Sequence, residues 1–203
     1  MILNTAALSN RERYQLLTSL VVPRPIAWVS TRSAAGARNL APFSYFAAIS
    51  ATPFLVSVSI GSRRGAPKDT LRNIRETGVF CVNVVTEGQL AQMNATSGEY
   101  GPEVDEFERA GLAAARADSV DAPYVADCPA VLECRVFKEV ELEGSANTLV
   151  IGEVLRVRLA DDLPMIAPAL LADSVALRPV GRLWGDLYAL LGDTPALARP
   201  PVH

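Results

Sequence analysis

The sequence predicts a mainly β protein, an antiparallel β-barrel with a few short helices, and three observations support this fold class. Segments rich in β-branched and aromatic residues recur at 26–31, 54–60, 79–85, 130–143 and 147–160. Helical patterns are short and do not alternate regularly with these segments, which argues against a doubly wound α/β fold. The length of 203 residues suits a single domain, because barrels of this size often remain undivided.

The composition argues against several kinds of partner and location. Half of the residues are hydrophobic, so the chain can bury a sizeable core. A formal net charge of −3 indicates neither nucleic acid nor a membrane surface as a partner. No apolar run is long enough to cross a bilayer, and the start lacks signal-peptide features. Cys81, Cys128 and Cys134 form no C-x-x-C motif, so we expect reduced thiols and a cytoplasmic protein.

The single histidine is His203, the last residue. A Ser-His-Asp or Cys-His hydrolase needs an internal histidine, and a histidine-based metal centre needs several. We therefore expect no metal site and no catalytic side chain. The chemistry of an enzyme with this sequence is predicted to come from a cofactor.

The first expected element is a helix over 10–20. Ser9 and Glu12 form a capping-box pattern at its start, and Pro23 follows its end. A hairpin comes next, with strands at 26–31 and 39–50.

Pro42 interrupts the second strand of this hairpin. Because proline donates no ladder hydrogen bond, it indicates a bulge or an edge position.

The remaining elements are shorter helices between strands. The strand at 54–60 alternates between aliphatic residues and serines. A helix is expected at 69–77, with Asp69 as its cap and Gly78 at its end. We expect order over about 10–190 and a mobile, proline-rich tail at 192–203.

The stretch RRGAPKDT, residues 63–70, is a candidate phosphate site. Helix N-termini carry free N–H groups and partial positive charge, and here Lys68 and Thr70 lie beside one. Asp69 would repel a phosphate, so its expected role is to cap the helix. The alternative is a solvated basic loop before a capped helix, and this stretch alone favours that alternative.

The hairpin is a candidate site for a flavin ring. Such a ring needs backbone N–H and C=O groups at one edge and flat apolar contact on its faces. A bulged strand frees backbone groups, and Ser30, Thr31 and Ser44 offer hydroxyls nearby. The alternative is a half-buried strand whose polar groups face solvent, and this stretch cannot decide between the two.

Taken together and in order, five segments resemble the flavin reductase-like FMN-binding proteins, which include flavoredoxins and reductase components of two-component monooxygenases. These segments are YQLLTSLVVPRPIAWVST, NLAPFSYF, KDTLRNIRETGVFCVNVV, DEFERAGL and LVIGEV. The resemblance runs from about Arg13 to Tyr188 and implies a split β-barrel in one domain over 1–203, with FMN near a homodimer interface. It places twelve residues at the cofactor: Ser30, Thr31, Asn39, Leu40, Ala41, Ser44, Tyr45, Ser59, Arg64, Lys68, Thr70 and Arg182.

The resemblance also implies a reaction. The leading hypothesis is NAD(P)H-dependent reduction of flavin, with NADH or NADPH as co-substrate and a monooxygenase as a partner. The alternative is an FMN flavoprotein or carrier that uses another donor or acceptor, such as ferric iron, a disulfide or a redox protein. One departure concerns Trp184, which stands where relatives often have glycine. Its large indole either narrows a nicotinamide site or packs elsewhere.

Overall fold

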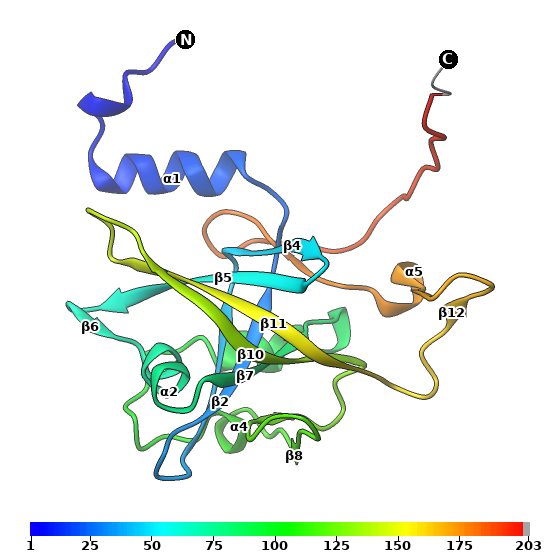
Figure 1. Ribbon diagram of the computed structural model, residues 1–203. Coiled ribbons are helices and arrows are strands. Elements are labelled where there is room, and N and C mark those ends of the chain that lie inside the picture. The colour runs from blue at the N-terminus through cyan, green and yellow to red at the C-terminus, as the bar shows by residue number, and fades with distance from the viewer. Residues whose placement is uncertain (201–203) are drawn as a thin grey trace.

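The computed structural model describes residues 1–200 and confirms a mainly β architecture (Figure 1). The long strands are β2 (Ala27–Arg32), β3 (Arg38–Phe43), β4 (Phe46–Ala51), β5 (Phe54–Arg63), β7 (Val79–Val84), β10 (Ala130–Glu141) and β11 (Asn147–Leu159). Short strands are β1 (Arg24–Pro25), β6 (Ala66–Pro67), β8 (Ala114–Arg116), β9 (Pro123–Val125), β12 (Met165–Ile166), β13 (Leu171–Ala172), β14 (Gly181–Arg182) and β15 (Tyr188–Ala189). The helices are η1 (Thr5–Ala7), α1 (Asn10–Leu20), α2 (Asp69–Thr77), η2 (Glu87–Gln89), α3 (Leu90–Ala95), α4 (Glu106–Arg109) and α5 (Ser174–Leu177).

One antiparallel sheet dominates the fold. Its order is β3-β2-β7-β10-β11-β5-β4, with β6 added to β5. The inner faces of β2, β3, β5, β7, β10 and β11 share one apolar cluster, so the sheet curves around a common core as in a split barrel. Leu71 and Ile74 of α2 belong to the same cluster, which places α2 against the barrel interior.

Strand β2 is buried on both faces along most of its length, which explains why its residues 27–29 are apolar without alternation. Ala27 and Val29 face the barrel interior, whereas Trp28 faces a second cluster beneath α3, α4 and β9. The Trp28 indole is fully buried there and donates to the Thr96 hydroxyl at 2.8 Å. A strand buried on both faces cannot show polar alternation.

The segment expected as one strand at 39–50 is in fact two strands. The chain leaves β3 at Ser44–Tyr45, and β4 then pairs with β5 at the other end of the sheet. Pro42 lies on β3, which is an edge strand, so the missing N–H costs no ladder bond. The β2–β3 register is continuous, so the edge position is confirmed and a bulge at Pro42 is not.

The helix expected at 69–77 is confirmed, and Gly78 ends it with a φ of 74°. The expected cap is wrong. Lys68 occupies the N-cap position and forms no side-chain cap, while Asp69 is the first helical residue and pairs with Arg72. The N-cap residue must leave the helical conformation, and the extended backbone of Lys68 meets that condition.

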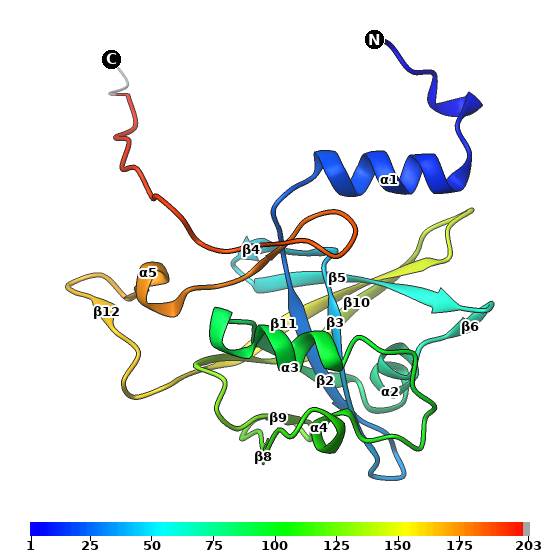
Figure 2. The same ribbon diagram turned by 180° about the vertical axis from the view of Figure 1, so that it is seen from behind.

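The N-terminal helix α1 lies apart from the barrel (Figures 1 and 2). Its predicted capping box is present, because Ser9 and Glu12 bond each other's backbone N–H groups. Thr18 is the only buried residue of α1, so the helix exposes apolar side chains that residues 1–200 do not cover. Within residues 1–200 no helix has the length and hydropathy of a membrane span. Residues 190–200 form no regular element, and the rest of the predicted tail, 201–203, lies outside the described residues.

Replacing Gly152 of β11 by alanine is expected to destabilise the barrel by about 1–3 kcal/mol, because an added methyl group in a packed core forces neighbouring atoms to move. A Cβ at this position would lie 2.5 Å from the ring of Phe80, which is fully buried. Urea unfolding should show the loss. Gly88→Ala is the control, since in the described part of the chain its added Cβ would meet no atom within 4 Å apart from its own neighbours along the chain. Equal midpoints for the two variants would contradict the tight contact.

Candidate functional site

Several of the predicted site residues line a cavity of about 470 Å³, here called the main cavity. It lies between β3, the start of α2 and the segment that joins α3 to α4, which passes beside α2 in Figure 2. Four of the twelve predicted residues line it: Asn39, Ala41, Lys68 and Thr70. The volume falls in the range of small-molecule and cofactor sites.

A buried hydrogen-bond chain forms one wall of the main cavity. Asn39 Oδ1 accepts from the Thr70 hydroxyl at 2.7 Å and from the Thr31 hydroxyl at 3.3 Å. Asn73 Nδ2 in turn donates to Thr31 at 3.0 Å. Thr31 itself is fully buried, so it supports the wall from behind and does not line the cavity.

Glu106 of α4 anchors this chain and is the main residue that the sequence reasoning missed. Its Oε2 accepts from the Leu40 backbone N–H at 3.0 Å and from Asn39 Nδ2 at 3.2 Å. Only 7% of Glu106 is exposed, and it lines the main cavity. Burial raises the pKa of its carboxyl, and the charge of Asp69 raises it further, while the two accepted hydrogen bonds oppose the shift.

The cationic side of the main cavity contains Lys68, Arg63 and Arg72. Lys68 Nζ lies 5.5 Å above the Phe43 ring and forms no ion pair within residues 1–200. Arg63 donates to the Tyr100 carbonyl at 2.8 Å and pairs with Glu99 at 3.2 Å, so it ties the α3–α4 segment across the cavity.

Arg64 does not line the main cavity, whereas its neighbour Arg63 does. It lies at the tip of the β5–β6 hairpin with a φ of 51°, followed by Gly65 at 80°. Two successive positive φ values are typical of a type I′ hairpin turn, which directs Arg64 into solvent.

Ser44 and Tyr45 lie beyond the end of β3, beside the buried guanidinium of Arg24. Arg24 is 6% exposed and reaches Ser44 Oγ at 3.4 Å. It also donates to the carbonyls of Thr18 and Leu183, so it joins α1, the hairpin and the C-terminal segment. Burial raises the pKa of the Tyr45 phenol.

Four other predicted residues do not line the main cavity: Ser30, Leu40, Ser59 and Arg182. Ser30 is fully buried and donates to the Pro123 carbonyl at 2.6 Å, which makes it a core contact. The Ser59 hydroxyl accepts from Asn147 Nδ2 at 3.0 Å.

Arg182 stacks 4.5 Å from the Tyr188 ring and donates to the Gly185 carbonyl. Leu40 is buried, and only its backbone N–H serves the site, through Glu106.

No local pattern in the sequence points to Glu106 or Arg24, the residues that sequence reasoning missed. Glu106 lies in DEFERAGL, where the pattern predicts an exposed acidic side chain on a short helix, but only 7% of it is exposed. Arg24 lies in the RPIAW stretch before a strand, and nothing local indicates that it is buried. All three cysteines are free and buried, and burial raises the pKa of Cys128 to about 11, so they are poor nucleophiles.

Comparison with known proteins places this chain among relatives of one family. The family model described as flavin reductase like domain matches residues 19–175. BH2278, an uncharacterised protein of Halalkalibacterium halodurans, is 41% identical over 207 residues, covering 100% of this chain and 98% of the relative. Nitrilotriacetate monooxygenase component B from Bacillus cereus superposes with a TM-score of 0.92 at 33% identity, over 97% of this chain and 98% of that one.

A second solved structure extends the comparison to a different named activity. The 2-nitrobenzoate 2-nitroreductase NbaA of Pseudomonas fluorescens has a TM-score of 0.89 at 28% identity, over 98% of this chain and 96% of that one. The match of the family model covers more than half of the chain and includes β3, α2 and α4, which build the main cavity. The chain therefore belongs to the flavin reductase-like family, and its fold is the split β-barrel of that family.

Proposed function

We propose that this protein is an NAD(P)H-dependent flavin reductase that holds FMN in the main cavity and along β3. The observation that carries the proposal is the pairing of Lys68 with the start of α2 at a cavity of cofactor size. Lys68 lacks an ion-pair partner among residues 1–200, and no N-cap side chain occupies the first N–H groups of α2. A cation and free helix N–H groups together form a phosphate site.

The donor set fits the FMN phosphate at the α2 end. The Thr70 hydroxyl is already directed to Asn39, so Lys68 and backbone N–H groups of α2 are the donors we propose. Asp69 forms an ion pair with Arg72, which reduces the repulsion that its carboxylate would exert on a phosphate. The sequence-based alternative of a merely solvated basic loop is thereby less well supported.

The apolar side of the cavity fits a flat ring. Ala41, Pro42 and Phe43 line it along β3, and the strand leads on to Ser44 and Tyr45. Because β3 is an edge strand, its outer backbone groups have no ladder partner. The Leu40 N–H is bonded to Glu106 and Pro42 has no N–H, so outer backbone carbonyls are the groups left for a ligand. When bound, a flavin supplies the hydride-accepting centre for reduction by a nicotinamide nucleotide, while the residues described here bind and orient it.

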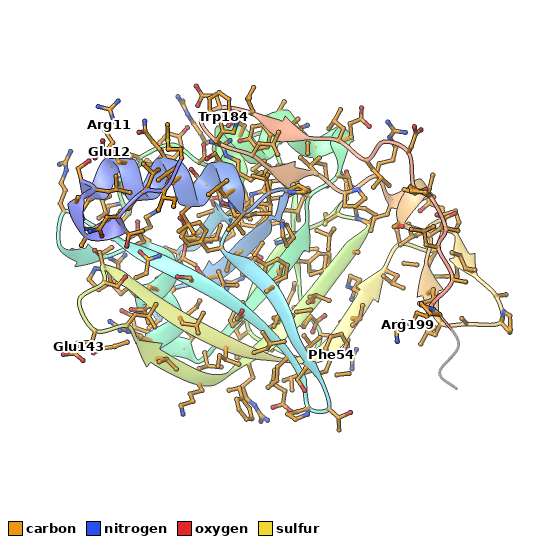
Figure 3. The ribbon with its side chains drawn as sticks, turned by 90° about the horizontal axis from the view of Figure 1, so that it is seen from above. Arg11, Glu12, Phe54, Glu143, Trp184 and Arg199 are labelled. Carbon is orange, nitrogen blue, oxygen red and sulfur yellow. The ribbon has the colours of Figure 1, made fainter. Side chains whose placement is uncertain are left out.

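The exposed surface around α1 supports a homodimer. Tyr14, Leu17 and Leu20 of α1 are 49–76% exposed, and Trp184 is 55% exposed. Trp184 projects outward near α1 in the view from above (Figure 3), and Arg24 ties its neighbour Leu183 to the end of that helix. We propose that a second copy covers this surface, because large contiguous apolar patches mark interfaces.

A dimer is therefore expected in solution, with a mass of twice 21.7 kDa by light scattering. Tyr14→Glu should shift the population toward monomer, because it buries a charge in the interface. Arg11→Glu, on the same helix, is the comparison that changes charge outside this apolar set. A monomer for the parent protein would refute the proposal for this surface.

A second candidate function is a flavoprotein that passes electrons to another acceptor. NbaA, which is similar over almost the whole chain, is named for reduction of a nitro compound. A nitro compound, ferric iron, a disulfide or a redox protein would then replace free flavin as the acceptor. The two candidates share the cofactor site. They differ in the product, which is reduced free flavin for the first candidate and another reduced acceptor for the second.

The first test is the visible spectrum of the purified protein, followed by NADH or NADPH with excess FMN in air. Rapid loss of the nicotinamide absorbance would support the reductase and identify its nucleotide. A flavin-loaded protein without nucleotide oxidation would favour the second candidate. A protein that neither carries nor takes up flavin would refute both.

A further inference from the structure

A second cavity of about 410 Å³ adjoins the main one and is here called the turn cavity, because the β2–β3 turn forms one wall. Six residues line both cavities: Asn39, Asp69, Arg72, Gly101, Pro102 and Glu106. The two spaces are thus neighbours on either side of the first turn of α2. A ligand whose phosphate lies at that turn has room to continue into the second space.

The floor of the turn cavity carries an unsatisfied polar atom. Asn73 lines this cavity but not the main one, and only 2% of it is exposed. Its Nδ2 donates to Thr31, whereas its Oδ1 has no hydrogen-bond partner among residues 1–200. A buried acceptor without a donor is rare in native proteins and costs about 1–3 kcal/mol. A ligand amine or hydroxyl that enters this cavity would supply the missing donor.

The walls offer groups suited to a nucleotide. Arg72 donates to Asp69 through Nη2 only, within the part of the chain that the structure describes, so its other N–H groups are open to a phosphate. Glu76 is an exposed carboxylate that accepts from the Ala34 N–H at 3.3 Å and can accept hydroxyls of a ribose. Ala34 and its neighbours on the turn are small and leave space for a flat base.

We infer that the turn cavity binds the adenosine monophosphate half of FAD, so that the protein accepts FAD and binds it more tightly than FMN. The inference rests on the proposed flavin site in the main cavity. It favours FAD over a nicotinamide dinucleotide because the shared wall is the α2 turn where the flavin phosphate is proposed. The second phosphate would continue from that point past Arg72, and the base would meet Asn73.

Binding titrations with wild-type protein test this directly through flavin fluorescence. We expect FAD to bind about tenfold or more tightly than FMN, because it makes added contacts. AMP should weaken FAD binding while leaving FMN binding unchanged. Equal affinities for the two flavins, or AMP without effect on FAD, would overturn the inference. AMP that displaces NADH but not FAD would assign the cavity to the nicotinamide nucleotide and overturn it too.

Two variants at one exposed position localise the effect. Ala34→Trp fills the turn cavity and should lower FAD affinity about tenfold toward that of FMN, with FMN affinity retained. Ala34→Ser leaves the space open and should match the parent protein. An unchanged FAD affinity in Ala34→Trp would refute the site. If FMN itself fails to bind the wild type, the proposed function fails; if FMN binds and FAD has no advantage, only this inference fails.

Discussion

Replacing Glu106 by alanine is expected to lower the free energy of unfolding by about 2–6 kcal/mol. The carboxylate accepts hydrogen bonds from the buried Leu40 N–H and Asn39 Nδ2, and its removal leaves both donors without a partner. Each unsatisfied buried donor costs about 1–3 kcal/mol, which sets the range. Because Asn39 also accepts hydrogen bonds from the Thr70 and Thr31 hydroxyls, the wall of the main cavity should become less rigid as well. Chemical denaturation followed by circular dichroism measures the change in the free energy of unfolding.

The control for this prediction is Glu108→Ala on the same short helix. The Glu108 side chain is 76% exposed and only pairs with Arg38 at the surface, so its loss should cost about 0–1 kcal/mol. Glu106→Gln keeps an acceptor for the buried donors and should recover most of the stability. Equal unfolding curves for Glu106→Ala and Glu108→Ala would show that the buried carboxylate contributes no more to the free energy of unfolding than the exposed one.

The same residue predicts a pH dependence whose sign is fixed by linkage. Burial raises the pKa of Glu106 above its ordinary value of 4.5, so the folded protein binds this proton more tightly than the unfolded chain. Its stabilising contribution is therefore present below the unfolded pKa and is lost as the pH rises through the folded pKa. The stability of wild type relative to Glu106→Gln should therefore fall as the pH rises from below 4.5 through the raised pKa of Glu106 in the folded protein. A constant difference would mean that this carboxyl is ionised as easily in the fold as in water, and a rising difference would mean that it is ionised more easily in the fold.

Replacing Lys68 by alanine is expected to weaken FMN binding about 10–150-fold, which is the loss of one charge-assisted contact of about 1.5–3 kcal/mol. Lys68 has no ion pair within residues 1–200, and its ammonium lies over Phe43 at the cavity wall. The substitution therefore removes a counter-charge for the phosphate without breaking a contact between charged side chains. Flavin fluorescence titration measures the affinity.

The chain offers a matched control, because Lys138 is its only other lysine. Lys138 lies exposed on β10, away from the residues of the main cavity, so Lys138→Ala should bind FMN as the parent does. Lys68→Arg keeps the charge and should retain most of the affinity. Parent-like binding by Lys68→Ala would remove this residue from the site and with it the main support for the phosphate position.

Local sequence patterns determined the elements that depend on neighbouring residues. The Ser9 and Glu12 pair specified the start of α1, and Gly78 specified the end of α2, because capping is satisfied within a few residues. Period-two alternation located β5, and its aliphatic residues are buried as expected. The ordered motifs of the hairpin, α2 and α4 identified the family, and the match over 19–175 confirms it.

Only the tertiary structure decided which of these residues meet. Ser30 and Thr31 read alike as hydroxyls on one strand, yet Ser30 is a core contact to Pro123 while Thr31 supports the cavity wall. Glu106 reads as a surface residue and is buried, because α4 packs against β3 from 66 residues away in the chain. Hydrogen-bond partners and exposure are properties of the folded arrangement, and no local pattern of side chains encodes them. The sequence alone thus determined the family and the elements with local capping or alternation signals, whereas long-range packing divided the segment 39–50 into two strands and decided the site.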